Sequence, residues 1–275
     1  MNKIGKYDII EFIGSGGFGD VYKAKDPVLQ RAVAIKIMKA EFKNEKAIFD
    51  TFQKEAILIC NINDINIVEV YDFSKYRGRP YIVMEFLTGV DLTHIIADKV
   101  NLPMDRKADI LVQTTKGLMA AHGQNIIHRD IKPGNIRLLD NNTVKIMDFG
   151  IARDPTSGQT TTGHFAGTIS YMSPEQIDRQ SVGKHSDLYS LGVVAYELIA
   201  YRHPFPGNNP LDVMEDILQK PPAPLNEIRD RNYFFLEDIV LKLLEKNPGD
   251  RFRTAEELLQ ALEAGETVEP KIPSS

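Results

Sequence analysis

The chain has 275 residues, 43% of them apolar, a formal net charge of −5 and one cysteine. A chain of this length buries roughly 75% of its unfolded surface, and a single cysteine excludes an internal disulfide framework. The acidic balance and the absence of a basic block argue against nucleic acid or anionic lipid as the main partner.

No apolar run approaches the ~18 residues that a membrane-spanning helix needs, and the first residues lack a signal-peptide pattern. These features are typical of a soluble intracellular protein in a reducing compartment, folded as one large domain or as two lobes that share a cleft. Cys60 lies in an apolar helical stretch, and we expect it to be a packed thiol.

Residues 7–13 favour a β-strand and lead into the glycine-rich stretch Gly14-Ser15-Gly16-Gly17-Phe18-Gly19. Dinucleotide-binding folds use the same glycine spacing, but there the glycines open a helix. Here Val21-Tyr22-Lys23-Ala24 continues as a strand. The pattern therefore predicts a hairpin whose tip covers phosphates, because glycine lets the backbone approach closely. A merely flexible turn is the alternative.

Residues 32–38 read as a buried strand that contains Lys36, and residues 45–61 have helical spacing with Glu55 on a neighbouring face. A lysine inside an apolar strand needs an anionic partner, since burying an unpaired charge is costly. The two residues together predict an ion pair. Taken singly, a lysine whose amine reaches solvent and an exposed glutamate are the alternatives.

Two more strands, at 67–73 and 81–86, give five strands and one helix in the first 87 residues, a small α+β unit. Thr88-Gly89-Val90 breaks this pattern and is the candidate hinge. The remainder is mostly helical, which indicates a second lobe. We expect helices at 104–123 and 185–200, an amphipathic helix from Leu236 to about Asn247, and a last helix opened by a capping box at Thr254–Glu257.

Residues His128–Asn135 place an imidazole, two cations, a carboxylate and a carboxamide within one short segment. Asp148-Phe149-Gly150 adds a second carboxylate after an apolar run. A packed core would not take so many polar groups. The two segments together suggest a metal–phosphate site with a base beside it.

The sequence resembles the eukaryotic-type (Hanks-type) serine/threonine protein kinases over about residues 7–262, because these motifs occur in that family's order. Ser173-Pro174-Glu175 is a further motif, and Met172–Gln176 is most similar to bacterial members. The resemblance implies an α+β, bilobal kinase fold. Its N-lobe (1–87) would be a five-stranded antiparallel sheet with one main helix, its C-lobe (88–265) mostly helical, and residues 266–275 a disordered tail.

The resemblance also implies roles in phosphoryl transfer, which needs mainly positioning and charge neutralisation. Lys36, fixed by Glu55, would hold the α- and β-phosphates of ATP beneath the glycine-rich stretch. Asp130 would accept the proton of the substrate hydroxyl. Lys132 would contact the γ-phosphate, and Thr168 would brace Asp130.

By the same resemblance Asn135 and Asp148 would hold Mg²⁺, which Mn²⁺ could replace, through oxygen ligands. The glycine-rich stretch and Lys36 would form part of the ATP site. Its further residues would be Ile13, Val21, Ala34, Met84, Glu85, Leu87 and Asp91. For the apolar members of this set, plain core packing is the alternative.

Arg137 departs from the family, which usually has leucine or methionine there as the floor of the adenine pocket. A guanidinium plane can stack beneath a base. The hypothesis is therefore that Arg137→Leu changes the KM for ATP several-fold. An unchanged KM would mean that Arg137 points out of the pocket.

Three further contacts are implied by the resemblance. His128 would pack against Phe149, Asp187 would brace the backbone of the catalytic loop, and Glu175 would pair with Arg251.

The threonine-rich segment between Asp148 and Glu175 is expected to be flexible and to be autophosphorylated at Thr160 and Thr162, and next at Thr161. Arg129 and Arg153 could order the segment by binding the phosphate.

Protein substrates that carry serine or threonine are the expected partners, with a homodimer for autophosphorylation and no nucleic acid. No direct membrane contact is expected of this chain. It would lie in the cytoplasm, alone or as the cytoplasmic domain of a longer membrane-anchored kinase. Two other readings are a pseudokinase that acts as a nucleotide-binding scaffold and a small-molecule kinase. The retention of Lys36, Asp130, Asn135 and Asp148 argues against the first, and the Gly167–Glu175 segment against the second.

Overall fold

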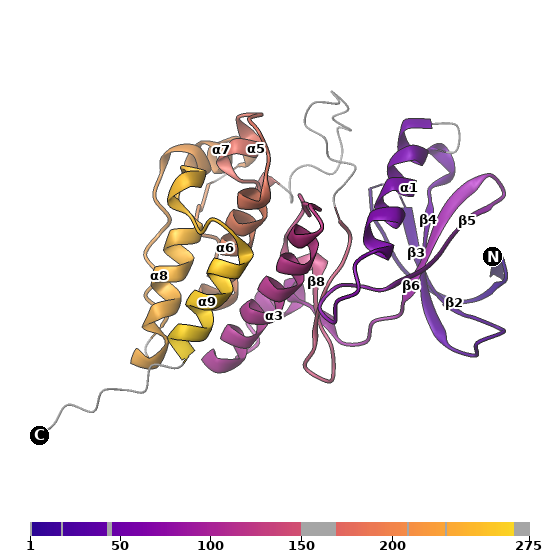
Figure 1. Cartoon of the computed structure of the whole chain (residues 1–275), viewed down its shortest axis with the longest axis horizontal. Helices are drawn as coiled ribbons and strands as arrows, with labels where there is room; N and C mark the ends of the chain where they lie inside the picture. Colours follow the sequence, from indigo (N-terminus) through magenta and orange to yellow (C-terminus); the bar gives the residue numbers. More distant parts are fainter. Residues whose placement is uncertain are drawn as a thin grey trace, which may run out of the picture.

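The computed structural model describes residues 2–17, 19–42, 46–149, 169–207, 209–228 and 230–266. Figure 1 shows a strand-rich N-terminal lobe and a helical C-terminal lobe, with the β8 region and α3 nearest the junction. This is the bilobal architecture that the sequence predicts.

The N-lobe sheet has six strands in the order β1-β2-β3-β4-β6-β5, and every neighbouring pair is antiparallel. The strands are β1 Lys3–Ile4, β2 Tyr7–Ser15, β3 Gly19–Lys25, β4 Ala32–Met38, β5 Val70–Tyr76 and β6 Arg79–Glu85. The predicted count of five is thus one short, because the two-residue β1 folds back onto β2 through a turn at Gly5, whose φ is 57°.

The strand expected at 67–73 begins later, at Val70. Residues before it bond to the other lobe instead, since the backbone N–H of Val68 donates to the carbonyl of Ile146 at 3.0 Å. Ile67 forms a parallel bridge with the same residue. This segment therefore belongs to the junction between the lobes.

Helix α1 (Lys46–Cys60) lies against the N-lobe sheet (Figure 1). Phe52 and Ala56 pack with Met38 of β4 and Ile82 of β6. The prediction that Cys60 is a packed thiol is wrong: it lies at the last position of α1, on the exposed side, and its thiol donates to the carbonyl of Ile57 at 3.1 Å.

A small second sheet lies at the junction, in the order β7-β8-β9. Its strands are β7 Val90–Asp91, β8 Ile136–Leu138 and β9 Val144–Ile146. The short helix α2 (Leu92–Ala97) follows β7, and the 3₁₀ turn η2 (Pro133–Asn135) precedes β8. This sheet places residues 128–135, here called the catalytic loop, beside the segment that connects β6 to β7.

The helical lobe is built around α6 (Lys184–Ala200), whose residues from Ser186 onward are all buried, as its apolar sequence predicts. The predicted helix at 104–123 is α3 (Met104–Gly123). The amphipathic helix is α8 (Phe234–Leu243), which begins before the expected Leu236 and ends before the expected Asn247. The remaining helical elements are α5 Pro174–Ile177, α7 Pro210–Gln219, α9 Ala255–Glu266, η1 Ala40–Phe42, η4 Arg231–Tyr233 and η5 Pro248–Asp250.

The capping box of α9 is present in part. The hydroxyl of Thr254 accepts from the N–H of Glu257 at 3.2 Å, whereas the carboxylate of Glu257 accepts from Arg253 at 2.9 Å instead of from Thr254. Of the tail predicted at 266–275, Glu266 ends α9, and 267–275 lie outside the described residues.

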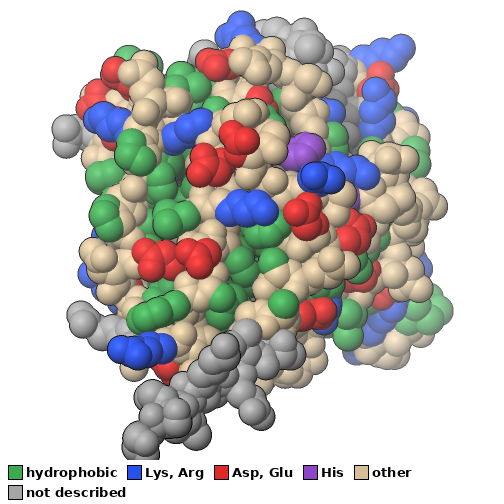
Figure 2. Space-filling model, turned by 60° about the vertical axis from the view of Figure 1, so that its left-hand side comes forward, with side chains coloured by type: hydrophobic (Ala, Val, Ile, Leu, Met, Phe, Trp, Pro, Cys, Tyr) green, Lys and Arg blue, Asp and Glu red, His purple; other side chains and the backbone are tan. Residues whose placement is uncertain are grey.

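Among the described helices, none combines the length and apolarity that crossing a membrane requires. Figure 2 turns the helical lobe toward the viewer and shows acidic, basic and apolar side chains interspersed over that face.

Candidate active site

The backbone of the catalytic loop is fixed from below by Asp187, at the start of α6. This carboxylate is buried and accepts hydrogen bonds from the backbone N–H groups of His128 and Arg129, both at 2.8 Å. Its Oδ2 also lies 2.8 Å from Nε2 of His122. Arg129 adopts a φ of 65°, which is costly for a residue with a side chain, and these bonds stabilise it there. The brace predicted for Asp187 is present.

His128 orients the two acidic segments relative to each other. Its Nδ1 accepts from the N–H of Asp130 at 3.2 Å, and its Nε2 donates to the carbonyl of Met147 at 3.0 Å. The ring packs on Phe149 with centroids 4.4 Å apart, as predicted. Complete burial lowers the pKa of His128, which agrees with a neutral ring protonated at Nε2.

Asp130 lies at the centre of a short polar network. The amide nitrogen of Asn135 donates to the Asp130 backbone carbonyl at 2.8 Å and to its carboxylate at 3.0 Å. Lys132 places its ammonium group 2.9 Å from the same carboxylate oxygen. The structure therefore brings together three of the predicted site residues.

Lys36 of β4 reaches across the junction to Asp148, with Nζ 2.8 Å from Oδ1. This ammonium group holds the pKa of Asp148 below its ordinary value, so the carboxylate is ionised at neutral pH. Asp148 has a φ of 51°, which turns its carboxylate out of the strand direction of β9. The side chain of Glu55 is outside what the structure describes, and its pairing with Lys36 stays a prediction.

The residues present fit a hard cation. Asn135 is 5% exposed and uses its side-chain amide nitrogen for both bonds to Asp130. The oxygen of the same side-chain amide is therefore the atom that can bind a cation. Asp148 supplies an ionised carboxylate thirteen positions later, after the β8–β9 hairpin. Amide and carboxylate oxygens are the ligands that Mg²⁺ takes, together with phosphate oxygens.

The glycine-rich stretch forms the turn between β2 and β3. The N–H of Gly16 donates to the carbonyl of Gly19 at 2.8 Å, and Ser15 bonds Asp20 at 2.9 Å. A Cβ at Gly19 would lie 3.1 Å from the carbonyl of Ile37, so the turn sits tightly on β4. A strand–turn–strand unit excludes the dinucleotide-binding alternative. Phe18 lies outside the described residues.

Three neighbouring strands carry several of the residues predicted to surround the base. Val21 of β3 faces Lys36 across the ladder, and Ala34 of β4 faces Met84 of β6. Ile13 is 46% exposed, whereas Ala34 and Leu87 are both 8% exposed.

Glu85 and Asp91, which were predicted to contact the nucleotide, already form hydrogen bonds within the protein. The N–H of Glu85 donates to Glu69 at 2.9 Å, so its backbone could meet a base edge only through the carbonyl. Asp91 caps α2 by accepting from Thr93 at 3.0 Å and contacts the ring of His94 at the same distance. A ribose contact of Asp91 would therefore share this carboxylate with the helix cap.

Arg137 directs its guanidinium at the hinge. Nε donates to the carbonyl of Thr88 at 3.0 Å, and Nη2 to the carbonyl of Gly89 at 2.7 Å. Sequence reasoning considered stacking beneath a base and missed these bonds. It also missed Lys145, which pairs with Glu85 at 2.6 Å, although a lysine inside an apolar strand is the same signal that singled out Lys36.

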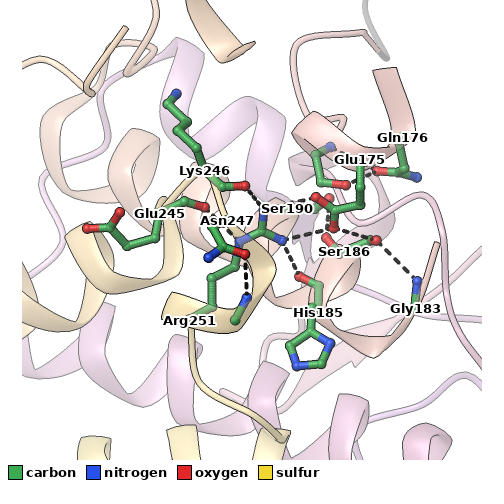
Figure 3. Close-up of polar contacts among 12 residues, drawn as sticks. Glu175, Gln176, Gly183, His185, Ser186, Ser190, Glu245, Lys246, Asn247 and Arg251 are labelled. Carbon is green, nitrogen blue, oxygen red and sulfur yellow. Dashed lines mark hydrogen bonds and ion pairs between the residues drawn. The ribbon is translucent and has the colours of Figure 1, made fainter. Parts of the chain in front are cut away.

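Glu175 of α5 and Arg251 form the predicted pair (Figure 3). Two guanidinium nitrogens lie 2.9 Å from the two carboxylate oxygens, a bidentate geometry. Ser186 donates to the same carboxylate at 2.7 Å, and Arg251 also donates to the carbonyls of Glu245, His185 and Lys246. Every hydrogen-bonding group of the pair is used, so the pair fixes α5 to the helical lobe.

Five of the residues given roles from the sequence fall outside the described residues: Thr160, Thr161, Thr162, Arg153 and Thr168. The phosphorylation of the three threonines, the phosphate contact of Arg153 and the bracing of Asp130 by Thr168 therefore stay predictions.

Comparison with known proteins agrees with this geometry. Residues 7–262 match the family model described as protein kinase domain. The chain is 39% identical over 259 residues to the probable serine/threonine-protein kinase CPE1738 of Clostridium perfringens, covering 94% of this chain and 38% of that protein. It is 37% identical over 260 residues to the serine/threonine-protein kinase PknB of Mycobacterium leprae, covering 92% of this chain and 42% of that protein.

The chain thus spans about two fifths of the length of these curated relatives. Among solved structures, the PknI kinase domain of Mycobacterium tuberculosis superposes with a TM-score of 0.73 at 25% identity, covering 96% of this chain and 97% of that one. The chain belongs to the protein kinase family and is most similar to bacterial serine/threonine kinases of the Hanks type.

Proposed function

We propose that this chain transfers the γ-phosphoryl group of ATP to serine or threonine hydroxyls of protein substrates, using Mg²⁺. The observation that carries the proposal is the convergence of two polar groups at the junction, one within the C-lobe and one that joins the two lobes. Asp130, Lys132 and Asn135 form one group, and Lys36 with Asp148 forms the other. Cations, ionised carboxylates and an amide oxygen at one junction suit a triphosphate and its metal.

Each group of this site has a task in the proposal. Asp130 accepts the proton of the attacking hydroxyl and aims its oxygen at phosphorus, while Lys132 neutralises charge on the transferring group. Lys36 holds the inner phosphates. Bound Mg²⁺, held by Asn135 and Asp148, would neutralise charge between the phosphates. His128, neutral and buried, hydrogen-bonds both Asp130 and Met147, the residue after β9, and so fixes their relative positions.

Four further proposals follow from the sequence. The catalytic unit is residues 1–265, which the family match at 7–262 supports. Autophosphorylation at Thr160 and Thr162, and next at Thr161, regulates it, and a homodimer brings two copies together for this reaction. The protein works in the cytoplasm.

The test compares wild type with Asp130→Asn in a radiolabelled-ATP assay on a generic basic protein. Asparagine keeps the shape but cannot accept the proton, so we expect a loss of about 10²–10⁴-fold in kcat. The matched control is Asp140→Asn, in the exposed turn of the β8–β9 hairpin, which should leave kcat unchanged. Equal labelling by wild type and Asp130→Asn would overturn the kinase assignment.

A further inference from the structure

The segment Glu85–Gly89, here called the hinge, connects β6 to β7 and is held at its far end by Arg137. One guanidinium group donates to two successive main-chain carbonyls, those of Thr88 and Gly89, at 3.0 and 2.7 Å. A rigid planar fork suits two such neighbouring acceptors better than a single ammonium would. The bond pair joins the hinge directly to strand β8.

The backbone itself lies close at this point. Asp91 and Val90 of β7 pair with Arg137 and Leu138 of β8. Gly89 has a φ of 78°, and a Cβ there would lie 2.1 Å from the carbonyl of Leu138. Only glycine permits this approach, so the exit of the hinge rests on β8.

The near end of the hinge is held by a second cation of the same hairpin. Lys145 of β9 is 9% exposed and places Nζ 2.6 Å from the carboxylate of Glu85 and 3.0 Å from the carbonyl of Ile67. The same Glu85 oxygen accepts from the N–H of Glu69 at 2.8 Å. Arg137 and Lys145 are direct register partners across β8 and β9.

We propose that Arg137 is a positioning residue for the nucleotide base, which it serves by bracing the hinge together with Lys145. The inference rests on the proposed function, because the base would meet the backbone of Glu85 and Leu87, between the two anchors. A hinge that is fixed before the nucleotide arrives loses less freedom when it binds, and this raises affinity. The bonds of Arg137 and Lys145 go to the hinge and to Ile67, not to Asp130, so we expect the brace to act on binding and not on the chemical step.

Substitutions at Arg137 can distinguish two roles for this residue: holding the hinge by hydrogen bonds, or packing beneath the base as the floor of its pocket. If Arg137 served by packing beneath the base, leucine would serve equally well, since it offers an apolar surface of similar extent. If it serves by hydrogen bonding to Thr88 and Gly89, leucine must fail and glutamine, which keeps an N–H donor, must recover part of the function.

The test measures ATP binding by isothermal titration calorimetry in Asp130→Asn protein, in which turnover is expected to be about 10²–10⁴-fold slower. We expect Arg137→Leu to raise the Kd about tenfold, as loss of one or two hydrogen bonds implies. Arg137→Gln should recover part of this loss, and Lys145→Met should weaken binding too. Arg106→Leu is the matched control, since Arg106 donates to the carbonyl of Asn142 in the turn of the same hairpin, and it should leave the Kd unchanged.

In protein that retains Asp130, Arg137→Leu should raise the KM for ATP while kcat changes less than about twofold. An unchanged Kd and KM in Arg137→Leu, or a fall in kcat alone, would overturn the brace. Failure of the Asp130→Asn protein itself to bind ATP would overturn the proposed nucleotide site instead, so the two failures are distinct.

Discussion

Two ion pairs of this chain each join segments far apart in sequence, yet their surroundings differ. Arg251 and Glu175 have side chains 0% and 4% exposed, and further bonds from Ser186 and to three carbonyls complete the cluster. Lys36 and Asp148 have side chains 16% and 45% exposed. The first pair is sealed within one lobe, and the second lies open between two.

The difference separates a structural pair from a pair that can take a ligand. A buried pair must satisfy all of its hydrogen-bonding groups within the protein, because no water replaces a missing partner. An open pair keeps access to solvent, and hence to phosphates and a cation. Burial and hydrogen bonding thus distinguish the two, although each is a cation beside a carboxylate at less than 3 Å.

Arg251→Ala would break the sealed pair and should have the largest effect on stability. It leaves the carboxylate of Glu175 buried without a cationic partner in the sealed pair, although Ser186 still donates to it, and this costs about 3–5 kcal/mol. A loss of this size lowers Tm by about 10 °C in a chain of this length, measurable by calorimetry. The double variant Glu175→Met/Arg251→Met should recover much of the loss, because neither charge then remains buried.

Arg253→Ala is the control for this experiment, because Arg253 lies two residues away and its side chain is exposed. Its Tm should match that of wild type. An Arg251→Ala protein as stable as wild type would show that the sealed pair contributes nothing to the fold.

Lys36→Met, at the open pair, should leave stability nearly unchanged and greatly reduce the rate of phosphoryl transfer. Methionine keeps the length of the side chain but not its charge, so Tm should change by only a few degrees. The rate of phosphoryl transfer should fall about 10²–10³-fold, the size of effect seen when one charge-stabilising group is removed. Steady-state kinetics and calorimetry on one preparation check both. A large drop in Tm with near-normal turnover would reverse the assignment of the two pairs.

The sequence predicted the open pair only in part. Lys36 stood out as a lysine within an apolar strand, and Asp148 as a carboxylate after one. Their direct contact at 2.8 Å was not predicted, because it depends on how closely the lobes approach. Lys145 gave the same sequence signal as Lys36, yet its partner Glu85 lies at the hinge and is no neighbour in sequence.

The sequence predicted the bounds of an element best where the apolar residues of that element alone determine which of its faces is buried. The helix at 104–123 was predicted with the bounds that α3 has, and the apolar α6 was placed to within one residue. Strand β5 was placed too early, because residues 67 and 68 bond to β9 across the junction. The orientation of Arg137 was missed for the same reason: its acceptors come from the hinge.

A third polar cluster, around Asp187 and His128, shows whether a buried carboxylate needs a cationic partner. Asp187 is buried like Glu175, but its partners are two backbone N–H groups and a histidine ring. Above it, His128 is fully enclosed and faces the carboxylates of Asp187, Asp130 and Asp148, which raise its pKa, although burial outweighs them and lowers it. Asp187 is therefore satisfied mainly by backbone N–H groups, next to the neutral ring of His128.

His128→Phe should reveal this neutrality through the pH dependence of stability. The folded pKa of His128 lies below its unfolded value near 6.5, so the unfolded chain binds the proton first as pH falls. Wild type should then lose stability below about pH 6.5, by at most about 1.4 kcal/mol per pH unit from this group.

Phenylalanine keeps the contact with Phe149 but cannot titrate. Its variant should be less stable at pH 7.5 by about 1–2 kcal/mol, since two hydrogen bonds are lost, and should show a shallower decline toward pH 5.5 in urea unfolding. Equal slopes for the two proteins would mean that folding does not lower the pKa of His128, and that its ring does not stay neutral in the folded chain.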